Sequence, residues 1–131
     1  MKIEGIGHLA LRCHDMEKSL AFYCGVLGME KAFSLDVDGK RCIEYLKVAP
    51  RQFLELFYDY EGGVVEGSFA HLCLHVEDIF EVEKALLAAG WPVDIAPKQG
   101  LDTNWQCWAT DPDGNKIEFM QLSPESPQAK A

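Results

Sequence analysis

Two histidines and two glutamates occur at matched positions in this sequence of 131 residues. Both His-to-Glu separations are 47 positions (8 to 55 and 71 to 118), and the second pair lies 63 positions after the first. Imidazole and carboxylate groups are ligands for divalent transition metals, and a six-coordinate ion held by four of them keeps two positions for substrate oxygens. We therefore expect His8, Glu55, His71 and Glu118 to form one metal site.

The sequence around these residues repeats with the same offset. A single His or Glu on a strand is more often a structural or solvent-facing residue than a ligand. Equal spacings within locally similar segments are instead typical of duplicated supersecondary units. The similar segments are Gly7–Leu11 and Ala70–Leu74 around the histidines, and Phe53–Phe57 and Lys116–Met120 around the glutamates.

Each half of the chain predicts the same order of elements, β-α-β-β-β. Asp15 and Asp78 stand where a helix N-cap belongs, and Gly28 and Gly90 follow the apolar periodicity of each helix as stop residues. Three short strands are expected after each helix, joined by turns such as Asp111 to Asn115. We therefore predict an α+β fold made of two βαβββ modules.

The predicted modules span residues 5–58 and 69–122. The Gly-rich, acidic segment 59–68 has little periodicity and is expected to be a linker. The tail 123–131 is rich in Pro, Ser and Ala and is expected to be disordered. Side chains alternate across a strand, so the His and Glu residues should face away from their leucine and isoleucine neighbours, on the concave side of a curved mixed sheet.

Composition limits the classes of partner. Hydrophobic residues make up 48% of the chain, which suits one compact domain, and the formal net charge is −9. Clustered Lys and Arg are absent, so nucleic acid and anionic membranes are not expected as partners. No signal segment or membrane span is recognised, and five cysteines without a CxxC pair are typical of buried free thiols, so we expect a cytoplasmic protein.

At these residues the chain resembles the vicinal oxygen chelate superfamily, and within it the short glyoxalase I (lactoylglutathione lyase) branch. The resemblance covers Ile6 to Leu122 as a single glyoxalase-like domain. It implies that His8, Glu55, His71 and Glu118 hold one Ni²⁺, Co²⁺ or Zn²⁺ ion. Other branches of the superfamily usually change one of these ligands, so the presence of both glutamates favours a glyoxalase-like site. The motifs that carry it are Gly7-His8, Ser19 to Tyr23 with Val26 to Met29, Phe69 to His71 with Val76 and Asp78, and Asp111 to Glu118.

The resemblance implies a metal-dependent lyase of the carbon–sulfur class. Its substrate would be the hemithioacetal of a thiol and a 2-oxoaldehyde such as methylglyoxal, and its product a 2-hydroxyacyl thioester, formed through an enediolate that the metal stabilises. Glu118 is expected to be the base that moves the proton. Glu55, in the pseudo-symmetric position, is expected to handle the opposite transfer, although the roles of the two could be exchanged.

Three residues are expected to contact the substrate. Arg12 matches an Arg that binds a glutathione carboxylate in glyoxalase I, Lys98 could supply a further cation, and Trp105 could line a pocket. Asp59 stands where glutathione-using relatives typically carry Asn, and its charge would repel the thiol's carboxylate. The identity of the thiol is therefore open.

Two alternatives remain at this stage. One is another enzyme of the same superfamily, such as an epimerase or a thiol transferase that confers antibiotic resistance. The other is a metal-free small-molecule-binding protein of the bleomycin-resistance type, which the intact ligand set disfavours. Family precedent implies a homodimer, because one βαβββ module is too small to enclose a site.

Overall fold

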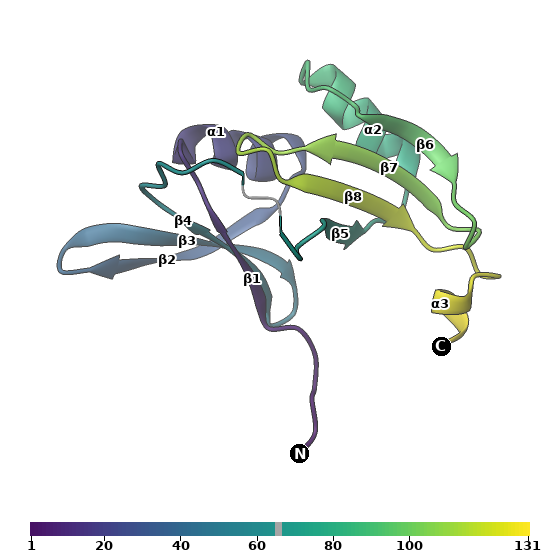
Figure 1. Cartoon of the computed structure of the whole chain (residues 1–131), viewed down its shortest axis with the longest axis horizontal. Coiled ribbons are helices and arrows are strands. Elements are labelled where there is room, and N and C mark those ends of the chain that lie inside the picture. Colours follow the sequence, from purple (N-terminus) through teal and green to yellow (C-terminus); the bar gives the residue numbers. More distant parts are fainter. Residues whose placement is uncertain (65–66) are drawn as a thin grey trace. The chain divides into compact units, whose positions relative to one another are not determined.

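The computed structural model describes residues 1–64 and 67–131, and residues 65 and 66 of the predicted linker lie outside the described part. The chain divides into two compact units, Met1–Gly63 and Val64–Ala131. This boundary lies within the segment 59–68. Each unit contains one four-stranded mixed sheet (Figure 1), which agrees with the predicted α+β fold of two βαβββ modules.

The first unit has the strand order β1-β4-β3-β2. Strands β1 and β4 are parallel, whereas β3 is antiparallel to both of its neighbours. The parallel pair matters for the site because it brings the first and last strands of the unit side by side. The elements are β1 (His8–Arg12), α1 (Met16–Leu20), the π-helix η1 (Ala21–Val26), β2 (Glu30–Val37), β3 (Lys40–Ala49) and β4 (Gln52–Phe57).

The second unit repeats this topology with the order β5-β8-β7-β6, in which β5 and β8 are parallel. Its helix α2 packs against β6, β7 and β8. The elements are β5 (Leu72–His75), α2 (Ile79–Ala88), β6 (Ile95–Gln99), β7 (Trp105–Thr110), β8 (Lys116–Gln121) and α3 (Pro127–Lys130).

The predicted helix boundaries are confirmed. The carboxylates of Asp15 and Asp78 each accept a hydrogen bond from a backbone N–H of the first turn, at 3.2 Å and 2.9 Å. Such caps satisfy N–H groups that have no partner inside the helix. Gly28 (φ 72°) and Gly90 (φ 67°) take up the left-handed conformation after each helix, which residues with a Cβ adopt only at a cost.

The first helical segment differs from the single α-helix that the periodicity predicted. The chain changes from α1 to the π-helix η1 after Leu20, and the N–H of Leu27 donates to the carbonyl of Phe22 over 3.0 Å, a five-residue step. Phe22 and Tyr23 are both fully buried there.

Within the described residues, no helix has the length and apolar character needed to cross a membrane.

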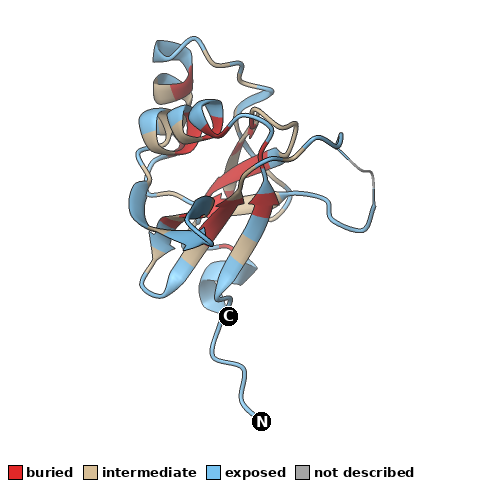
Figure 2. Ribbon diagram, turned by 90° about the vertical axis from the view of Figure 1, so that its left-hand side faces the viewer, coloured by how far each residue is buried: buried red, intermediate tan, exposed pale blue. Residues whose placement is uncertain are grey.

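The core of each unit lies on the sheet face opposite the predicted ligands. In the first unit it includes Leu46, Leu54 and Leu56, and in the second Ile117 and Phe119, all less than 3% exposed. Burial of such a side chain is worth about 1.5 to 3 kcal/mol relative to leaving it in water. Figure 2 shows the buried residues along the strands and helices. This apolar packing fixes the register of the strands. It therefore also determines which side chains lie on the opposite face, where the predicted ligands are.

The C-terminal tail is ordered, in contrast to the disorder that its composition suggested. The one-turn helix α3 begins with Ser126 as its N-cap, and Ser126 is fully buried. Asn104, which is 1% exposed, donates from its amide nitrogen to Gln128 and accepts from the backbone N–H of Ser123 at 2.9 Å. A buried amide thus ties the tail to the second unit, which a compositional argument could not detect.

Candidate functional site

In the first unit, His8 and Glu55 lie on the same face of neighbouring parallel strands. Glu55 of β4 is the register partner of Ala10 in β1, and His8 is two residues before Ala10, so the two side chains point to the same side. The Nδ1 atom of His8 is 3.4 Å from Oε1 of Glu55. Glu55 is buried, whereas His8 is exposed.

The second unit holds an equivalent pair. Glu118 of β8 is the register partner of Cys73 in β5, and His71 directly precedes β5, again two residues before that partner. The Nε2 atom of His71 is 2.9 Å from Oε2 of Glu118, and Glu118 is 7% exposed. Two similar pairs therefore occur at the same places in two similar units.

Each pair offers one imidazole nitrogen and one carboxylate oxygen. Burying a carboxylate without a partner is costly. The near neighbour of each glutamate is a histidine, which is charged only if it is protonated, so the two groups of each pair can instead bind a cation together. Nitrogen and oxygen donors of this kind fit a divalent transition metal. Within residues 1–64 and 67–131, no three His, Cys, Asp or Glu side chains lie together in a metal-binding arrangement.

Aromatic residues surround Glu55. Tyr45 of β3 is its register partner on the other side. The Tyr45 ring stacks on Phe33 with centroids 4.2 Å apart and meets Phe53 edge-on at 6.2 Å. Burial, together with the negative charge of Glu55, raises the pKa of Tyr45. The hydroxyl therefore remains a donor at neutral pH.

A different set of neighbours surrounds Glu118. Trp108 of β7 is its register partner and meets the His71 ring edge-on, with centroids 4.8 Å apart. Cys73 is the register partner of Glu118 on the parallel strand β5. Burial, followed by the charge of Glu118, raises the pKa of Cys73 to about 12, so the group is a neutral thiol rather than a thiolate.

The predicted substrate residues are placed differently from one another. Arg12 is exposed and shares the face of His8, since four residues separate them on β1. Lys98 is exposed on the Glu118 face, because its partner is Gln106, two residues from Trp108. The structure does not bring Trp105 to this face. Its ring contacts Phe80 of α2, with centroids 5.3 Å apart.

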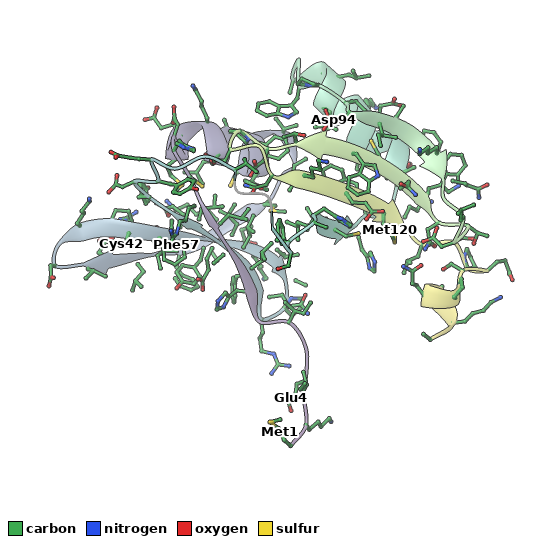
Figure 3. All side chains as sticks on the ribbon, in the orientation of Figure 1. Met1, Glu4, Cys42, Phe57, Asp94 and Met120 are labelled. Atoms are coloured by element: carbon green, nitrogen blue, oxygen red, sulfur yellow. The ribbon has the colours of Figure 1, made fainter. Side chains whose placement is uncertain are left out.

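Sequence reasoning missed Tyr45 and Cys73, and of the two aromatics Trp105 and Trp108 it selected Trp105 for the site. Tyr45 and Trp108 lie 63 positions apart, the same offset as the histidines and the glutamates, so this aromatic match was a usable signal. Phe57 and Met120, labelled in Figure 3, occupy equivalent positions two residues after each glutamate and therefore line the same faces. The signal for Cys73 was weaker because its counterpart is Ala10.

Asp59, which raised the question about the thiol, is not an isolated charge. Its carboxylate is ion-paired with the Lys40 ammonium, and both side chains are largely exposed. The backbone of Asp59 has φ 61°, a conformation that Asp and Asn adopt more readily than most residues. Asn would thus fit this backbone, whereas Asp adds a charge that Lys40 offsets.

A second buried carboxylate, Glu44, lies on the opposite face of β3 and is 1% exposed. Burial alone would raise the pKa of Glu44, but hydrogen bonds from four side chains outweigh that effect and lower it from 4.5 to about 2. The donors are Lys31, Ser34, Tyr58 and Arg41. Glu44 is therefore fully paired, so the candidate site remains on the other face.

A known family model covers most of the chain. The model of the Glyoxalase/Bleomycin resistance protein/Dioxygenase superfamily matches residues 5–119 of the chain. That range includes both His–Glu pairs and all eight strands except the last two residues of β8.

Two curated relatives have the same length of match. A probable lactoylglutathione lyase of Synechocystis sp. is 31% identical over 125 residues, which cover 88% of this chain and 94% of the relative. The lactoylglutathione lyase of Haemophilus influenzae is 32% identical over 125 residues, covering 87% and 90%. TnmS3, an antibiotic binding protein from Streptomyces sp. CB03234, is 24% identical with TM-score 0.76 and coverage of 94% and 99%, which shows a shared fold.

Proposed function

This chain belongs to the Glyoxalase/Bleomycin resistance protein/Dioxygenase superfamily, and from this premise we propose that it is a glyoxalase I-like lyase that depends on a divalent metal. The observation that carries the proposal is the occurrence of one His–Glu pair at the same register position in each unit. Curated relatives with lyase names, similar over most of their length, support the reaction class.

The metal ligands in this proposal are His8, Glu55, His71 and Glu118. Each unit supplies one imidazole and one carboxylate, so two pairs give the four donors that a six-coordinate ion can use while two positions stay open. The ion is Ni²⁺, Co²⁺ or Zn²⁺. The pairs combine either within one chain or between the two chains of a homodimer.

Held by these four residues, such an ion would supply Lewis acidity and make the C–H bond of a bound hemithioacetal more acidic. Glu118 then takes the proton from that carbon and returns it to the adjacent carbon, the former ketone. The O–H proton of the first carbon moves to the former ketone oxygen, so the first carbon becomes the thioester carbonyl and the second carbon ends with a hydroxyl group. Reactant and product are isomers, so the reaction needs no oxidant and no reductant.

The remaining charged residues have binding roles. Arg12 and Lys98 are exposed cations on the faces of Glu55 and Glu118, and they would attract the carboxylates of the thiol. Trp108 takes the pocket-lining role that the sequence analysis gave to Trp105, because Trp108 is the residue beside Glu118. The ion pair of Asp59 with Lys40 reduces the repulsion that Asp59 would exert on glutathione.

Calorimetric titration of the metal-stripped protein with Ni²⁺ and Zn²⁺ tests the metal site. Glu118→Gln should weaken binding by about 100-fold or more, since even partners outside the ligand set cost 10- to 100-fold. Glu81→Gln is the control, because Glu81 lies on α2 and its carboxylate pairs with the exposed Lys84. If the wild type binds neither metal, the lyase proposal fails and the small-molecule-binding alternative takes its place.

Turnover of hemithioacetals, followed through the thioester product, tests the reaction. Methylglyoxal is combined in turn with glutathione and with other low-molecular-weight thiols. We expect metal-loaded protein to turn over at least one of them and Glu118→Gln to lose about 10²-fold or more of kcat, as expected for a missing general base. A metal-loaded protein that turns over none would contradict the lyase assignment.

Mixing two inactive variants tests the dimer. His8→Ala removes a ligand from the first unit and Glu118→Gln removes one from the second. If each site combines units from different chains, subunit exchange creates one intact site per mixed dimer, and activity should return. If each site forms within one chain, mixing restores nothing. A monomeric wild type in analytical ultracentrifugation would contradict the homodimer.

A further inference from the structure

The sheet face that holds Glu118 carries polar side chains in the row next to Glu118. Lys98, Gln106 and Met120 are successive register partners across β6, β7 and β8, and Met120 is labelled in Figure 3. The residues 63 positions earlier, which are register partners in the first unit, are apolar: Leu35, Ile43 and Phe57. The polar groups at this end of the face are therefore an addition to the repeated unit.

The side-chain amide of Gln106 is oriented by Trp108. The indole nitrogen of Trp108 can only donate, and it donates to Oε1 of Gln106 at 2.9 Å. The amide nitrogen of Gln106 thus remains a donor for another group. It lies over Gly100, where an added Cβ would be 2.5 Å from it. Glycine at position 100 leaves the space that this nitrogen occupies.

A chain of hydrogen bonds orients the amide of Gln128 in the same way. The Ser123 N–H can only donate, and it donates to the carbonyl oxygen of Asn104 at 2.9 Å. The Asn104 amide nitrogen then donates to the Asp102 carboxylate at 2.9 Å and to the Gln128 carbonyl oxygen. This leaves the Gln128 amide nitrogen 4.0 Å from the Met120 sulfur, and a thioether is a weak acceptor.

Two oriented N–H donors therefore flank Met120, which lies two residues, or about 7 Å, along β8 from Glu118. Both donors are uncharged. The Asp102 carboxylate lies beside them, since its Oδ1 would be 2.8 Å from the same added Cβ at Gly100. Its charge disfavours an anionic ligand group at this place. A neutral carbonyl oxygen, such as that of an amide, suits these donors better.

We propose that Gln106 and Gln128 bind an amide carbonyl in the thiol part of the substrate, so that the C-terminal tail takes part in substrate recognition. The proposal rests on the proposed function, because it specifies which thiols that site prefers: those with an amide a few bonds from the sulfur. The two glutamines determine specificity and do not act in the proton transfer. They bind substrate and transition state alike, so their removal raises KM and leaves kcat unchanged.

Two hemithioacetals of methylglyoxal test the proposal with the metal-loaded protein. One is made with N-acetylcysteamine, an uncharged thiol that carries an amide, and the other with 1-propanethiol, which has none. Gln106→Glu and Gln128→Glu keep an oxygen that accepts from Trp108 or Asn104 but remove the free N–H donor. Each should raise KM for the amide substrate by about three- to tenfold, as expected for one hydrogen bond. KM for the propanethiol substrate should stay unchanged.

The control for the added charge is Gln99→Glu. Gln99 lies on the opposite face of β6, where its amide donates to the carbonyl of Thr103 at 3.3 Å. This variant should keep the wild-type ratio of the two KM values. If Gln106→Glu and Gln128→Glu also keep that ratio, or raise both KM values equally, the proposal is overturned.

Nuclear magnetic resonance supplies a readout independent of turnover. In metal-free, ¹⁵N-labelled protein, N-acetylcysteamine should shift the side-chain amide signals of Gln106 and Gln128, assigned from the two variants, and leave that of Gln99 in place. 1-Propanethiol should shift none of them. If the wild type turns over no hemithioacetal, the lyase proposal fails by itself. The amide site is then supported by these shifts, and their absence overturns it.

Discussion

Trp108 meets the His71 imidazole edge-on, with ring centroids 4.8 Å apart. This contact makes the indole a natural reporter of any ion bound to His71. We predict that Ni²⁺ or Co²⁺, added to metal-free protein, quenches the tryptophan fluorescence in proportion to site occupancy. Trp108→Phe should remove most of this response.

The control for that experiment is Trp91→Phe. The Trp91 indole N–H donates at 2.9 Å to the carbonyl of Thr110, whose register partner in β8 is Lys116 rather than Glu118. Trp91→Phe should lower the total fluorescence but leave the metal-dependent fraction in place. Full quenching in Trp108→Phe would mean that the ion binds elsewhere.

The ionisation of Glu44 should make the free energy of unfolding depend on pH. Its pKa is lowered to about 2 in the folded protein, so its contribution is complete above pH 4.5 and disappears as the pH falls toward 2. The shift corresponds to a contribution on the order of 3 kcal/mol. We predict that the wild type loses more stability over this interval than Glu44→Gln does, measured by urea unfolding at several pH values.

Glu81→Gln is the matched control, because the Glu81–Lys84 pair is exposed and such pairs contribute little. Its pH dependence between 4.5 and 2 should parallel that of the wild type. If Glu44→Gln also parallels the wild type, the hydrogen bonds around Glu44 do not stabilise its ionised form.

Much of the fold could be predicted because its signals are local. Asp15 and Asp78 act through caps within one turn, and the alternation of each strand depends only on which side chains are apolar. The equal His-to-Glu spacings then follow from duplicated topology. A repeat of a whole unit can therefore be detected in a single sequence.

The parts that escaped prediction depend on contacts between distant residues. The order of the C-terminal tail depends on hydrogen bonds to the buried amide of Asn104. The composition of the tail itself does not indicate that such a partner exists. The face of Trp105 depends on the register of β7, since a shift of one residue would exchange Trp105 with its neighbours. The change from α1 to η1 likewise has no periodic signal.

Asp111 should control how β8 presents Glu118. Its carboxylate accepts hydrogen bonds from the backbone N–H of Asp113 at 3.0 Å and of Asn115 at 2.8 Å, in the turn that leads directly into β8. Asp111→Ala leaves these donors without that acceptor, so we predict a loss of about 1 to 3 kcal/mol in the free energy of unfolding. Weaker metal binding should accompany it, measured by calorimetry.

Asp113→Ala tests whether the loss of any carboxylate from this turn has the same effect. It removes an acidic side chain but keeps the backbone N–H that donates to Asp111. It should cost less than Asp111→Ala in both measurements. Equal losses for the two variants would show that the Asp111 carboxylate has no special part in the turn.

Asn104 should determine whether the tail is ordered. Its amide nitrogen donates to Gln128 and also to Asp102 at 2.9 Å, and its carbonyl oxygen accepts from the Ser123 N–H, so one buried side chain joins the loop before β7 to the tail. Asn104→Ala should release residues 123–131, which we expect to appear as faster hydrogen exchange there and earlier proteolysis. The unfolding free energy should fall by about 1 to 3 kcal/mol, because buried donors and acceptors lose their partner.

Gln128→Ala provides the finer comparison. It removes one bond to Asn104 but leaves the Ser123 N–H bonded to the Asn104 carbonyl oxygen. Exchange should therefore rise around α3 while the backbone at Ser123 stays protected. If Asn104→Ala leaves exchange in the tail unchanged, the buried amide does not keep the tail in place.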